Sequence, residues 1–270
     1  MITNPRLSNP DQQTTTYKQA VRKAFDKAAD SYDHHAQFQR KVGSLLMDML
    51  PRNLSGKVIV DLGCGTGYFS EQLAARGAEV ICVDLSSQML EKARQRCGEQ
   101  NVSYVCMDAE SLSLSDCSVD YVFSSLALQW CHELEKPFHQ IRRVLKPDGQ
   151  ALFTTLIEGS LFELESSWRK VDKHQHINRF HSTIQVKIAL AQAECDRYHL
   201  KSTHMTMWYP SAFELMKDLK GIGANHVSGR AGGLTARRTL LDVEQAYQEI
   251  KNDEGLLPAT YHVCLGVIYR

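Results

Sequence analysis

Three glycines and one carboxylate gather in Asp61–Gly67 (DLGCGTG), directly after a short apolar run. Glycine allows a tight turn and lets a ligand approach bare backbone. The spacing G-x-G-x-G differs from the G-x-G-x-x-G of dinucleotide sites. A carboxylate at Asp61 would also repel a pyrophosphate, whereas it would attract an ammonium group. The segment therefore predicts a site for a ligand that carries an amine, built on Asp61, Gly63, Gly65 and Gly67.

Two further carboxylates stand at the ends of the next two apolar runs. Asp84 can accept hydrogen bonds from both hydroxyls of a ribose, although it could equally cap a helix that begins near Ser86. Asp108 can accept a hydrogen bond from an adenine amino group, and the small Ala109 leaves room for the ring. A plain turn residue at the end of a strand would look the same. An amine, a ribose and an adenine together indicate S-adenosylmethionine as the ligand.

These carboxylates need secondary structure that brings them to one edge. Apolar runs rich in β-branched residues alternate with helical spacing through the first half of the chain. We expect strands over 57–62, 79–85, 101–107, 119–124 and 150–156, and helices over 68–75, 86–97 and 133–144. This alternation predicts a parallel sheet with helices on both faces. Ligands of such sheets bind at the carboxyl ends of the strands, where the three carboxylates fall.

The remaining segments surround this α/β unit. We expect helices over 17–29 and 35–50 before it, and a largely helical stretch after residue 156 with one strand over 203–209. The apolar run 261–269 predicts a last strand that returns to the sheet. The expected organisation is an N-terminal helical lid (1–54), a cofactor-binding core (55–158), a mainly helical insertion for the substrate (159–258) and the final strand (259–270).

The composition argues against several classes of protein. The 270 residues include 31 Lys and Arg against 31 Asp and Glu, which disfavours a coat for nucleic acid and a membrane-surface protein. No apolar run is long enough to span a membrane, and the first residues lack the apolar stretch of a secretion signal. The eight cysteines form no C-x-x-C pair. We therefore expect reduced thiols in the cytoplasm and no metal site.

The charge is uneven along the chain. Residues 159–240 contain 12 Lys and Arg and 7 Asp and Glu, a net charge of +5, so the rest of the chain carries −5. The same segment holds six of the eleven histidines. Chance variation of surface charge explains this asymmetry equally well until a charged partner is proposed.

The form D-x-G-C-G-T-G and the strand ends that follow it, over about residues 55–156, resemble the class I S-adenosylmethionine-dependent methyltransferases. The resemblance implies an α/β fold with a Rossmann-like, seven-stranded, mostly parallel sheet whose last strand is antiparallel. It also implies an enzyme that releases S-adenosylhomocysteine. Leu85, beside Asp84, and Ala127, after the fourth strand, are assigned to the cofactor site by the same resemblance.

Other motifs narrow the family. The N-terminal pattern Phe25, Ala28, Ala29, Tyr32, Asp33, Ala36, Gln39 is similar to the lid of methyltransferases for small molecules and acyl groups, which implies a cofactor contact for Gln39. Five segments resemble the malonyl-[acyl-carrier protein] O-methyltransferases of biotin synthesis: 124–130 (SSLALQW), 176–180 (HINRF), 219–226 (LKGIGANH), 233–237 (GLTAR) and 255–261 (GLLPATY). This resemblance covers nearly the whole chain from about residue 20.

The resemblance implies methylation of the free carboxylate of a malonyl thioester on acyl-carrier protein, which gives the ester that primes pimeloyl synthesis. A carboxylate with a pKa of about 4 needs no general base at neutral pH. We therefore expect alignment and removal of water to supply most of the acceleration, without a triad, a metal or a covalent intermediate. Candidate catalytic residues are Arg179, which would hold one carboxylate oxygen, its neighbour His176, and Tyr32, which would orient the acceptor. Arg230 and Arg237 are second choices, and a surface ion pair is an equal alternative for each arginine.

Carrier proteins of fatty-acid synthesis are strongly acidic, so the net charge of +5 predicts a docking surface in the insertion. The candidate contacts are Lys170, Lys173, Lys187, Lys217, Lys220, Arg237 and Arg238. Trp168, Phe180, Trp208 and Tyr209 are candidates for an acyl tunnel, although such aromatic residues are also typical of a core.

Two other functions stay open at this point. One is a methyltransferase that acts on another small-molecule carboxylate, and the other is a non-catalytic protein that binds S-adenosylmethionine. A nucleic-acid methyltransferase is disfavoured because residues 125–129 lack the N/D-P-P-Y type of turn that serves exocyclic amines.

Overall fold

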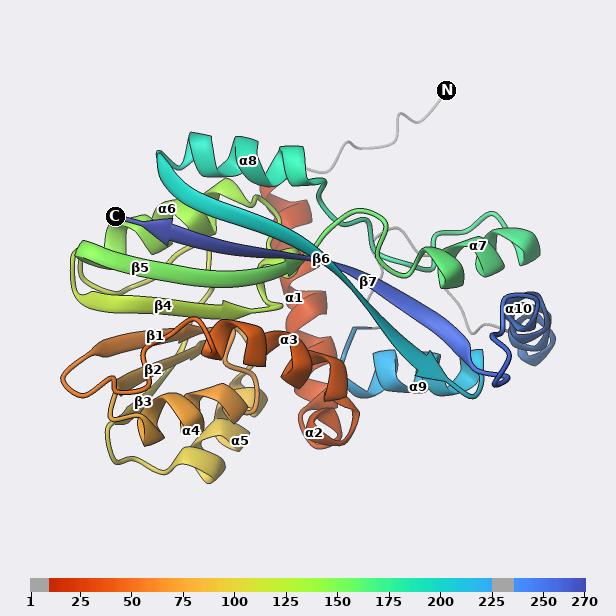
Figure 1. Cartoon of the computed structure of the whole chain (residues 1–270), viewed down its shortest axis with the longest axis horizontal. Coiled ribbons are helices and arrows are strands. Elements are labelled where there is room, and N and C mark those ends of the chain that lie inside the picture. The colour runs from red at the N-terminus through yellow and green to blue at the C-terminus, as the bar shows by residue number, and fades with distance from the viewer. Residues whose placement is uncertain (1–9, 225–235) are drawn as a thin grey trace, which may run out of the picture.

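The computed structural model describes residues 10–224 and 236–270. One sheet of seven strands runs through the molecule in the order β3-β2-β1-β4-β5-β7-β6 (Figure 1). The strands are β1 (Val58–Leu62), β2 (Glu79–Asp84), β3 (Val102–Cys106), β4 (Val119–Ser125), β5 (Leu145–Leu156), β6 (Arg197–Tyr209) and β7 (Leu257–Tyr269). The first five strands pair in parallel, and β7 is antiparallel to both β5 and β6. The predicted parallel sheet with an antiparallel last strand is confirmed.

Helices cover both faces of this sheet, as the sequence predicts. On one face, α6 (Glu135–Val144) and α8 (Thr183–Gln192) bury apolar side chains against β1, β4 and β5. On the other face, α3 (Gln37–Met47), α4 (Tyr68–Ala75) and α5 (Ser87–Cys97) do the same. A sheet with two apolar faces needs a layer of helices on each face to keep it from water. This explains why β1, between the two layers, is buried along nearly its whole length.

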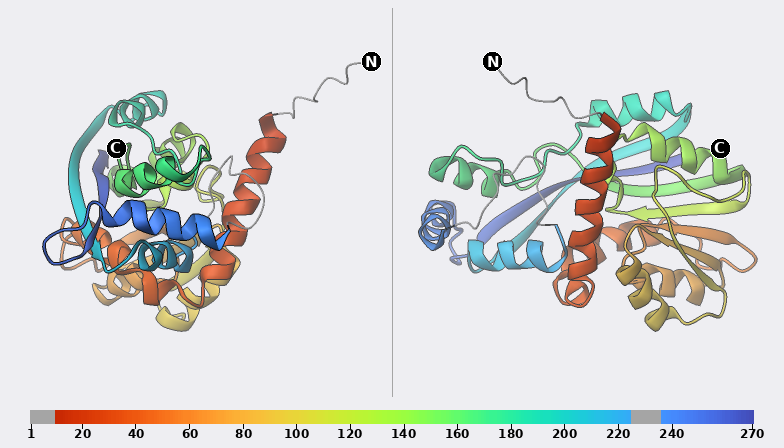
Figure 2. Two further views of the ribbon diagram at one scale, coloured as in Figure 1. Left: turned by 90° about the vertical axis from the view of Figure 1, so that its right-hand side faces the viewer. Right: turned by 180° about the vertical axis from the view of Figure 1, so that it is seen from behind.

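The segment predicted to form a lid (1–54) contains α1 (Pro10–Ala28), the short α2 (Tyr32–His35) and α3, and we use the name lid for α1 and α2. Figures 1 and 2 show α1 as a long rod that crosses the molecule beside the carboxyl ends of the parallel strands. The other helical elements are η1 (Leu128–Trp130), α7 (Phe162–Val171), α9 (Ala212–Gly221) and α10 (Arg237–Gln248). The helices α7, α9 and α10 pack around the far ends of β6 and β7, in a separate cluster of buried residues.

The last two strands are longer than the sequence indicates. β6 begins at Arg197 instead of residue 203, and β7 begins at Leu257 instead of residue 261. β6 is an edge strand, and only Met207 among its residues is buried, so its sequence carries no alternating apolar pattern over most of its length. The segment 159–258, expected to be mainly helical, therefore also supplies β6 and the start of β7 to the sheet.

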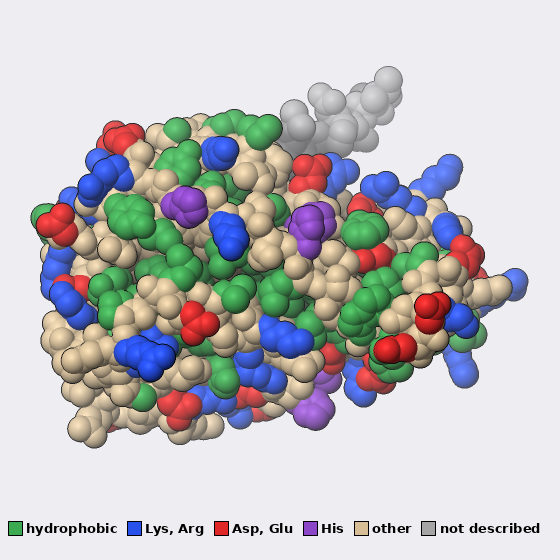
Figure 3. Space-filling view, viewed as in Figure 1, with side chains coloured by type: hydrophobic (Ala, Val, Ile, Leu, Met, Phe, Trp, Pro, Cys, Tyr) green, Lys and Arg blue, Asp and Glu red, His purple; other side chains and the backbone are tan. Residues whose placement is uncertain are grey.

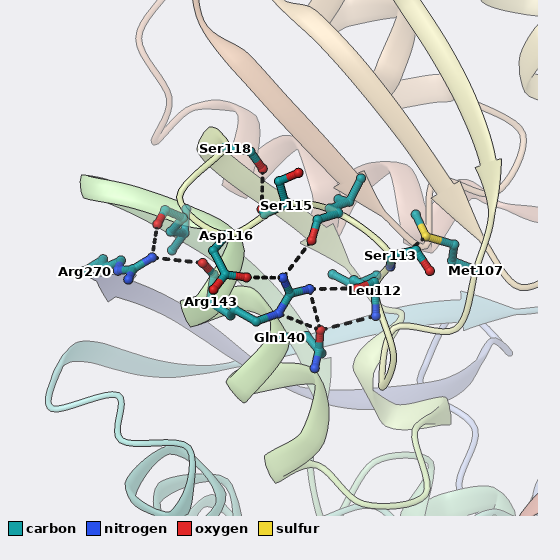
Figure 4. Close-up of polar contacts among 11 residues, drawn as sticks. Met107, Leu112, Ser113, Ser115, Asp116, Ser118, Gln140, Arg143 and Arg270 are labelled. Atoms are coloured by element: carbon teal, nitrogen blue, oxygen red, sulfur yellow. Dashed lines mark hydrogen bonds and ion pairs between the residues drawn. The ribbon is translucent and has the colours of Figure 1, made fainter.

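Arg143, on α6, fixes the loop that leaves β3. Its guanidinium group donates hydrogen bonds to the carbonyl oxygens of Leu112 and Leu114, both at 2.7 Å, and to the Asp116 carboxylate at 2.5 Å (Figure 4). The backbone oxygen of Arg143 accepts a hydrogen bond from Arg270 at 2.9 Å. The loop that begins with Asp108 is thus tied to the core at its far end.

No helix among the described residues is long and apolar enough to cross a membrane.

Candidate active site

The glycine segment forms the turn between β1 and α4, and two of its glycines cannot be replaced without a clash. Gly63 has a φ of +75°, and a Cβ atom there would lie 2.3 Å from the Cβ of Ala127. Gly67 has a φ of +79° and begins α4, and a Cβ atom there would lie 2.9 Å from the Cβ of Ala93. Gly63 and Gly65 line cavities, whereas Gly67 serves the packing of α4 against α5.

Asp84 is held rigidly at the end of β2. One carboxylate oxygen accepts the backbone N–H of Gly65 at 2.9 Å, and the other accepts that of Ser86 at 2.8 Å. Burial raises the pKa of Asp84 to about 6, although these two hydrogen bonds oppose the shift. The cap of α5 is the hydroxyl of Ser86, which accepts a hydrogen bond from the N–H of Met89. Capping therefore does not explain Asp84, and its remaining lone pairs are available to two neighbouring hydroxyl groups.

Asp108 lies on the loop after β3 and meets the lid. One oxygen accepts the N–H of Glu110 at 3.0 Å, and the other accepts a hydrogen bond from the Lys18 ammonium of α1. Lys18 also lies 2.8 Å from the Glu110 carboxylate. Burial lowers the pKa of Lys18, but the hydrogen bonds to both carboxylates outweigh it and raise the pKa overall. Besides the Asp108 carboxylate, the Lys18 ammonium thus also lies beside the position that we predict for an adenine.

Asp61 is buried at the end of β1, 3% exposed, and accepts a hydrogen bond from the hydroxyl of Ser70 at 2.5 Å. Burial raises the pKa of Asp61 to about 7, against the opposing effect of that hydrogen bond. A cationic ligand beside Asp61 would lower this pKa again and keep the carboxylate ionised.

Three cavities share Tyr32 in their walls. The strand-end cavity is lined by Gly63, Gly65, Asp84, Leu85, Asp108, Ala109 and Ala127, together with Lys18 and other residues. The glycine-loop cavity is lined by Asp61, Gly63, Gly65 and Gln39, among others. The apolar cavity lies between the lid, β7 and α9. Tyr32 lines all three, and burial, followed by the charge of Asp84, raises the pKa of its hydroxyl, so it is a neutral donor.

The apolar cavity has polar but uncharged groups in its wall. Its polar lining residues are Tyr32, Gln39, Gln129, Asn178 and Tyr261, and among the described residues no charged side chain lines it. The side-chain oxygen of Gln39 is buried and has no hydrogen-bond partner, the one such atom among the described side chains. Gln39 also lines the glycine-loop cavity, so its amide stands between the two spaces. A buried oxygen without a partner is costly, and a ligand that donates to it would remove that cost.

The lid is fastened to the segment after each of the first three strands. Asp33 accepts a hydrogen bond from the hydroxyl of Thr66 in the glycine turn at 2.6 Å and pairs with Arg96. Asp26 accepts one from the hydroxyl of Ser86 at 2.6 Å, and Lys18 reaches Asp108. Neither Lys18 nor Asp26 is among the site residues predicted from the sequence. The signal that could have found them is a polar side chain on the apolar, core-facing side of a predicted helix.

The structure does not bring two of the predicted catalytic residues into these cavities. Arg179 is exposed, whereas the residues on either side of it, Asn178 and Phe180, line the apolar cavity. His176 stacks on Trp168 with ring centroids 3.5 Å apart, and its Nε2 lies 2.9 Å from both oxygens of Asp172. This arrangement gives His176 a packing role and leaves Tyr32 as the predicted catalytic residue that does reach the cavities.

Of the two second-choice arginines, the structure describes only Arg237, which lines none of these cavities. Arg237 is exposed at the start of α10, and Arg230 lies outside the described residues, as do Asn225 and His226 and residues 233–235 of the family motifs. Of the four aromatic candidates for a tunnel, Phe180 lines the apolar cavity. Trp208 is 49% exposed, and Trp168 packs in the cluster of buried residues around α7.

No group of three or more His, Cys, Asp and Glu side chains that could hold a metal ion occurs in the described part of the chain.

Known proteins share this architecture. The family described as a methyltransferase domain matches residues 60–153. A putative methyltransferase of Bacillus halodurans superposes with a TM-score of 0.59 at 18% identity, over 84% of this chain and 97% of that one. A phosphoethanolamine N-methyltransferase of Haemonchus contortus, solved with S-adenosylhomocysteine, gives 0.58 at 20% identity, over 91% of this chain and 57% of that one. At these identities the likeness concerns the fold.

The fold and the site together define a class I S-adenosylmethionine-dependent methyltransferase. The chain is 42% identical over 257 residues to a malonyl-[acyl-carrier protein] O-methyltransferase of Serratia marcescens, covering 95% of this chain and 97% of that protein. A protein of the same name from Yersinia pestis is 40% identical over 94% of this chain and 92% of its own length. The chain thus belongs to the malonyl-[acyl-carrier protein] O-methyltransferase family, which confirms the resemblance predicted from its motifs.

A longer relative contains the same unit. The biotin biosynthesis bifunctional protein BioHC of Cellvibrio japonicus is 40% identical over 258 residues, and the chain spans 51% of its length.

Proposed function

We propose that the protein transfers a methyl group from S-adenosylmethionine to the free carboxylate of malonyl-[acyl-carrier protein], giving the methyl ester that primes pimeloyl synthesis for biotin. The observation that carries this proposal is the apolar cavity, which shares Tyr32 with the cofactor cavities and has uncharged hydrogen-bond donors in its wall. The names of the relatives support the choice of malonyl thioester and carrier protein. The name of the bifunctional relative supports a role in biotin synthesis.

The residues present fit the cofactor. In the strand-end cavity, Asp84 would accept the two ribose hydroxyls beside Leu85, and Asp108 with Ala109 would face the adenine. In the glycine-loop cavity, Asp61 and the unpartnered oxygen of Gln39 would accept from the ammonium group. A side chain at Gly63 would clash with Ala127, so glycine keeps this part of the cavity wall open to a ligand. When bound, S-adenosylmethionine supplies an electrophilic methyl group on a positively charged sulfur.

The acceptor needs no activation by a base. A malonyl carboxylate with a pKa of about 4 is ionised at neutral pH. Attack on the sulfonium cancels the charge of both partners, so a polar solvent stabilises the separated charges more than the transition state. Phe25, Phe38 and Phe180 in the wall of the apolar cavity add no charge and would displace water from a bound acceptor. We expect this removal of water, together with alignment, to supply most of the acceleration.

Neutral donors suit this acceptor better than a cation. A bidentate arginine would occupy both carboxylate oxygens and weaken the nucleophile. The Tyr32 hydroxyl and the Gln39 and Asn178 amides can each donate to one oxygen and leave the other free to attack. We therefore favour Tyr32 as the group that orients the acceptor, and Asn178 over its exposed neighbour Arg179 as a carboxylate contact.

The location proposed for the reaction is the cytoplasm. All eight cysteines are free thiols, and three of them are buried. Free thiols in this number are typical of a reducing compartment.

A comparison of carrier substrates tests the function. We expect the protein to form S-adenosylhomocysteine with malonyl-carrier protein but not with acetyl-carrier protein, which has the same thioester and no carboxylate. Equal rates with both substrates, or no reaction with malonyl-carrier protein, would contradict the proposal.

A further inference from the structure

A second recess lies on the outer side of the lid, between α1 and α9. We call it the lysine groove, and it measures about 530 Å³. Its floor is the row of small residues Ala20, Ala24 and Ala28 on α1. Lys23 and Lys27 rise from α1 at its rim, and Lys217 and Lys220 rise from α9 opposite them. Figure 2 shows α9 beside the C-terminal half of α1. Four exposed lysines from two helices thus line one open recess.

The positive charge of the lysine groove is largely unbalanced. Within the part of the chain that the structure describes, no carboxylate lines it, and Lys23, Lys27 and Lys220 form no ion pair. Lys217 has an exposed contact of 3.5 Å with Glu214, which contributes little. The neighbouring acid Asp218 is engaged by the ring of His35 at 2.6 Å. Four like charges in one recess repel each other, so the groove is suited to an anion.

Two other predicted contacts, Lys170 and Lys187, lie apart from this groove. Lys170, on α7, is paired with Glu249 at 2.6 Å. Figure 3 shows Lys and Arg side chains spread over the end of the molecule formed by α7 and α10, interspersed with acidic ones. Lys187 lies on α8, which packs on the opposite part of the sheet. Of the seven contacts predicted from the sequence, the structure brings Lys217 and Lys220 together and adds Lys23 and Lys27.

The lysine groove adjoins the apolar cavity. Lys220 and Gly221 line the groove, whereas Leu219, Ile222 and Ala224 line the apolar cavity. The end of α9 and the residues that follow it are therefore the partition between the two spaces. On α1, Ala24 and Ala28 face the groove, and Phe25 faces the cavity. The groove and the apolar cavity are therefore neighbours that share the same stretches of α1 and α9.

We propose that the lysine groove binds the phosphodiester through which the carrier protein holds its acyl-bearing pantetheine arm. This inference rests on the proposed function. The phosphodiester is a compact, permanently charged anion at a fixed distance from the malonyl thioester, and it sits on an acidic protein. Lysine ammonium groups bind such an anion as point charges without requiring one fixed geometry. The groove then selects carrier-linked malonyl groups and directs the arm toward the apolar cavity.

Three acceptors separate the contributions of phosphate and protein. Malonyl-carrier protein carries both, malonyl-coenzyme A keeps a phosphate at the same place on the arm, and malonyl-pantetheine has neither. The test variant is Lys23→Gln combined with Lys220→Gln, one change on each wall. The matched control is Lys201→Gln combined with Lys251→Gln, which removes two exposed lysines that are neither in the groove nor among the predicted docking contacts. S-adenosylmethionine affinity, measured by calorimetry, shows that each variant is folded.

The groove variant should raise KM at least about fivefold for malonyl-carrier protein and for malonyl-coenzyme A, with kcat within about twofold. It should leave malonyl-pantetheine unchanged, and the control variant should change none of the three. A loss confined to the carrier protein would assign the groove to the protein surface and overturn the proposal, as would an equal loss in the control. If the parent protein methylates none of the three, the proposed function fails and this inference falls with it. If the parent methylates them and the groove variant matches it, the inference alone fails.

Discussion

Gln39 allows a prediction in which stability and binding change in opposite directions. Its side-chain oxygen is buried without a partner, and its amide stands between the glycine-loop cavity and the apolar cavity. A buried acceptor without a hydrogen bond costs about 1–3 kcal/mol. Gln39→Met keeps the length of the side chain and removes that oxygen. The ligand-free variant should therefore be more stable than the parent, by up to about that amount.

The same substitution should weaken the cofactor complex. A hydrogen bond to a charged group contributes about 1.5–3 kcal/mol, and we propose that Gln39 accepts one from the ammonium group of S-adenosylmethionine. Its loss corresponds to an increase in Kd of about tenfold to 150-fold. Isothermal titration measures Kd, and denaturant unfolding without ligand measures stability. Both are needed, because a general packing defect would lower stability and affinity together.

Gln129→Met is the matched control. Gln129 lines the same apolar cavity, but its amide already donates a hydrogen bond to the carbonyl of Leu126 at 2.8 Å. Removing a satisfied group leaves that carbonyl without its donor, so this variant should be less stable than the parent. If Gln39→Met is instead destabilised like Gln129→Met and keeps the parent's Kd, then Gln39 is a structural residue and the reasoning is refuted.

Other changes test separate parts of the site. Asp84→Asn should raise the Kd of S-adenosylmethionine by at least about tenfold, because an amide can accept a hydrogen bond from one ribose hydroxyl but not from both. An unchanged Kd in calorimetry would show that Asp84 does not bind the ribose. Arg179→Met should keep kcat/KM for malonyl-carrier protein within about twofold of the parent value, since the Arg179 side chain is exposed. Asn178→Ala should lower kcat/KM by about tenfold, because Asn178 lines the apolar cavity. A larger loss of kcat/KM in Arg179→Met than in Asn178→Ala would restore Arg179 as the carboxylate contact. Burial raises the pKa of Asp61 to about 7 in the folded protein, compared with about 4 in the unfolded chain. The folded state therefore binds the proton more tightly, so the contribution of Asp61 to stability falls as the pH rises from about 4 to 7. Denaturant unfolding over that pH range should show a smaller fall in Asp61→Asn, and identical profiles for both proteins would contradict the assignment.

The cofactor half of the site was predictable because its signals are local. The glycine turn requires particular backbone conformations, and the strand ends follow directly from the apolar runs before Asp61, Asp84 and Asp108. Parallel strands then place the three carboxylates at one edge without further information. The choice between a capping and a ligand-binding role for Asp84 needed the structure, which gives the cap to Ser86.

The acceptor half was harder to predict because it depends on contacts between distant segments. Whether Asn178 or Arg179 faces the apolar cavity is decided by the conformation of the loop between α7 and α8, which has no periodic pattern. The lysine groove joins α1 to α9, about 190 residues apart in the chain, and a count over residues 159–240 includes Lys217 and Lys220 but misses Lys23 and Lys27. The edge strand β6 was too polar to be recognised over its full length.

Mass spectrometry of malonyl-carrier protein tests the central claim most directly. After incubation with the protein and S-adenosylmethionine, we predict that the malonyl group gains one methyl group, that the gain requires the cofactor, and that an esterase reverses it. The absence of any gain, or a methyl group that resists the esterase or lies on the carrier polypeptide, would contradict carboxyl methylation of malonyl-carrier protein.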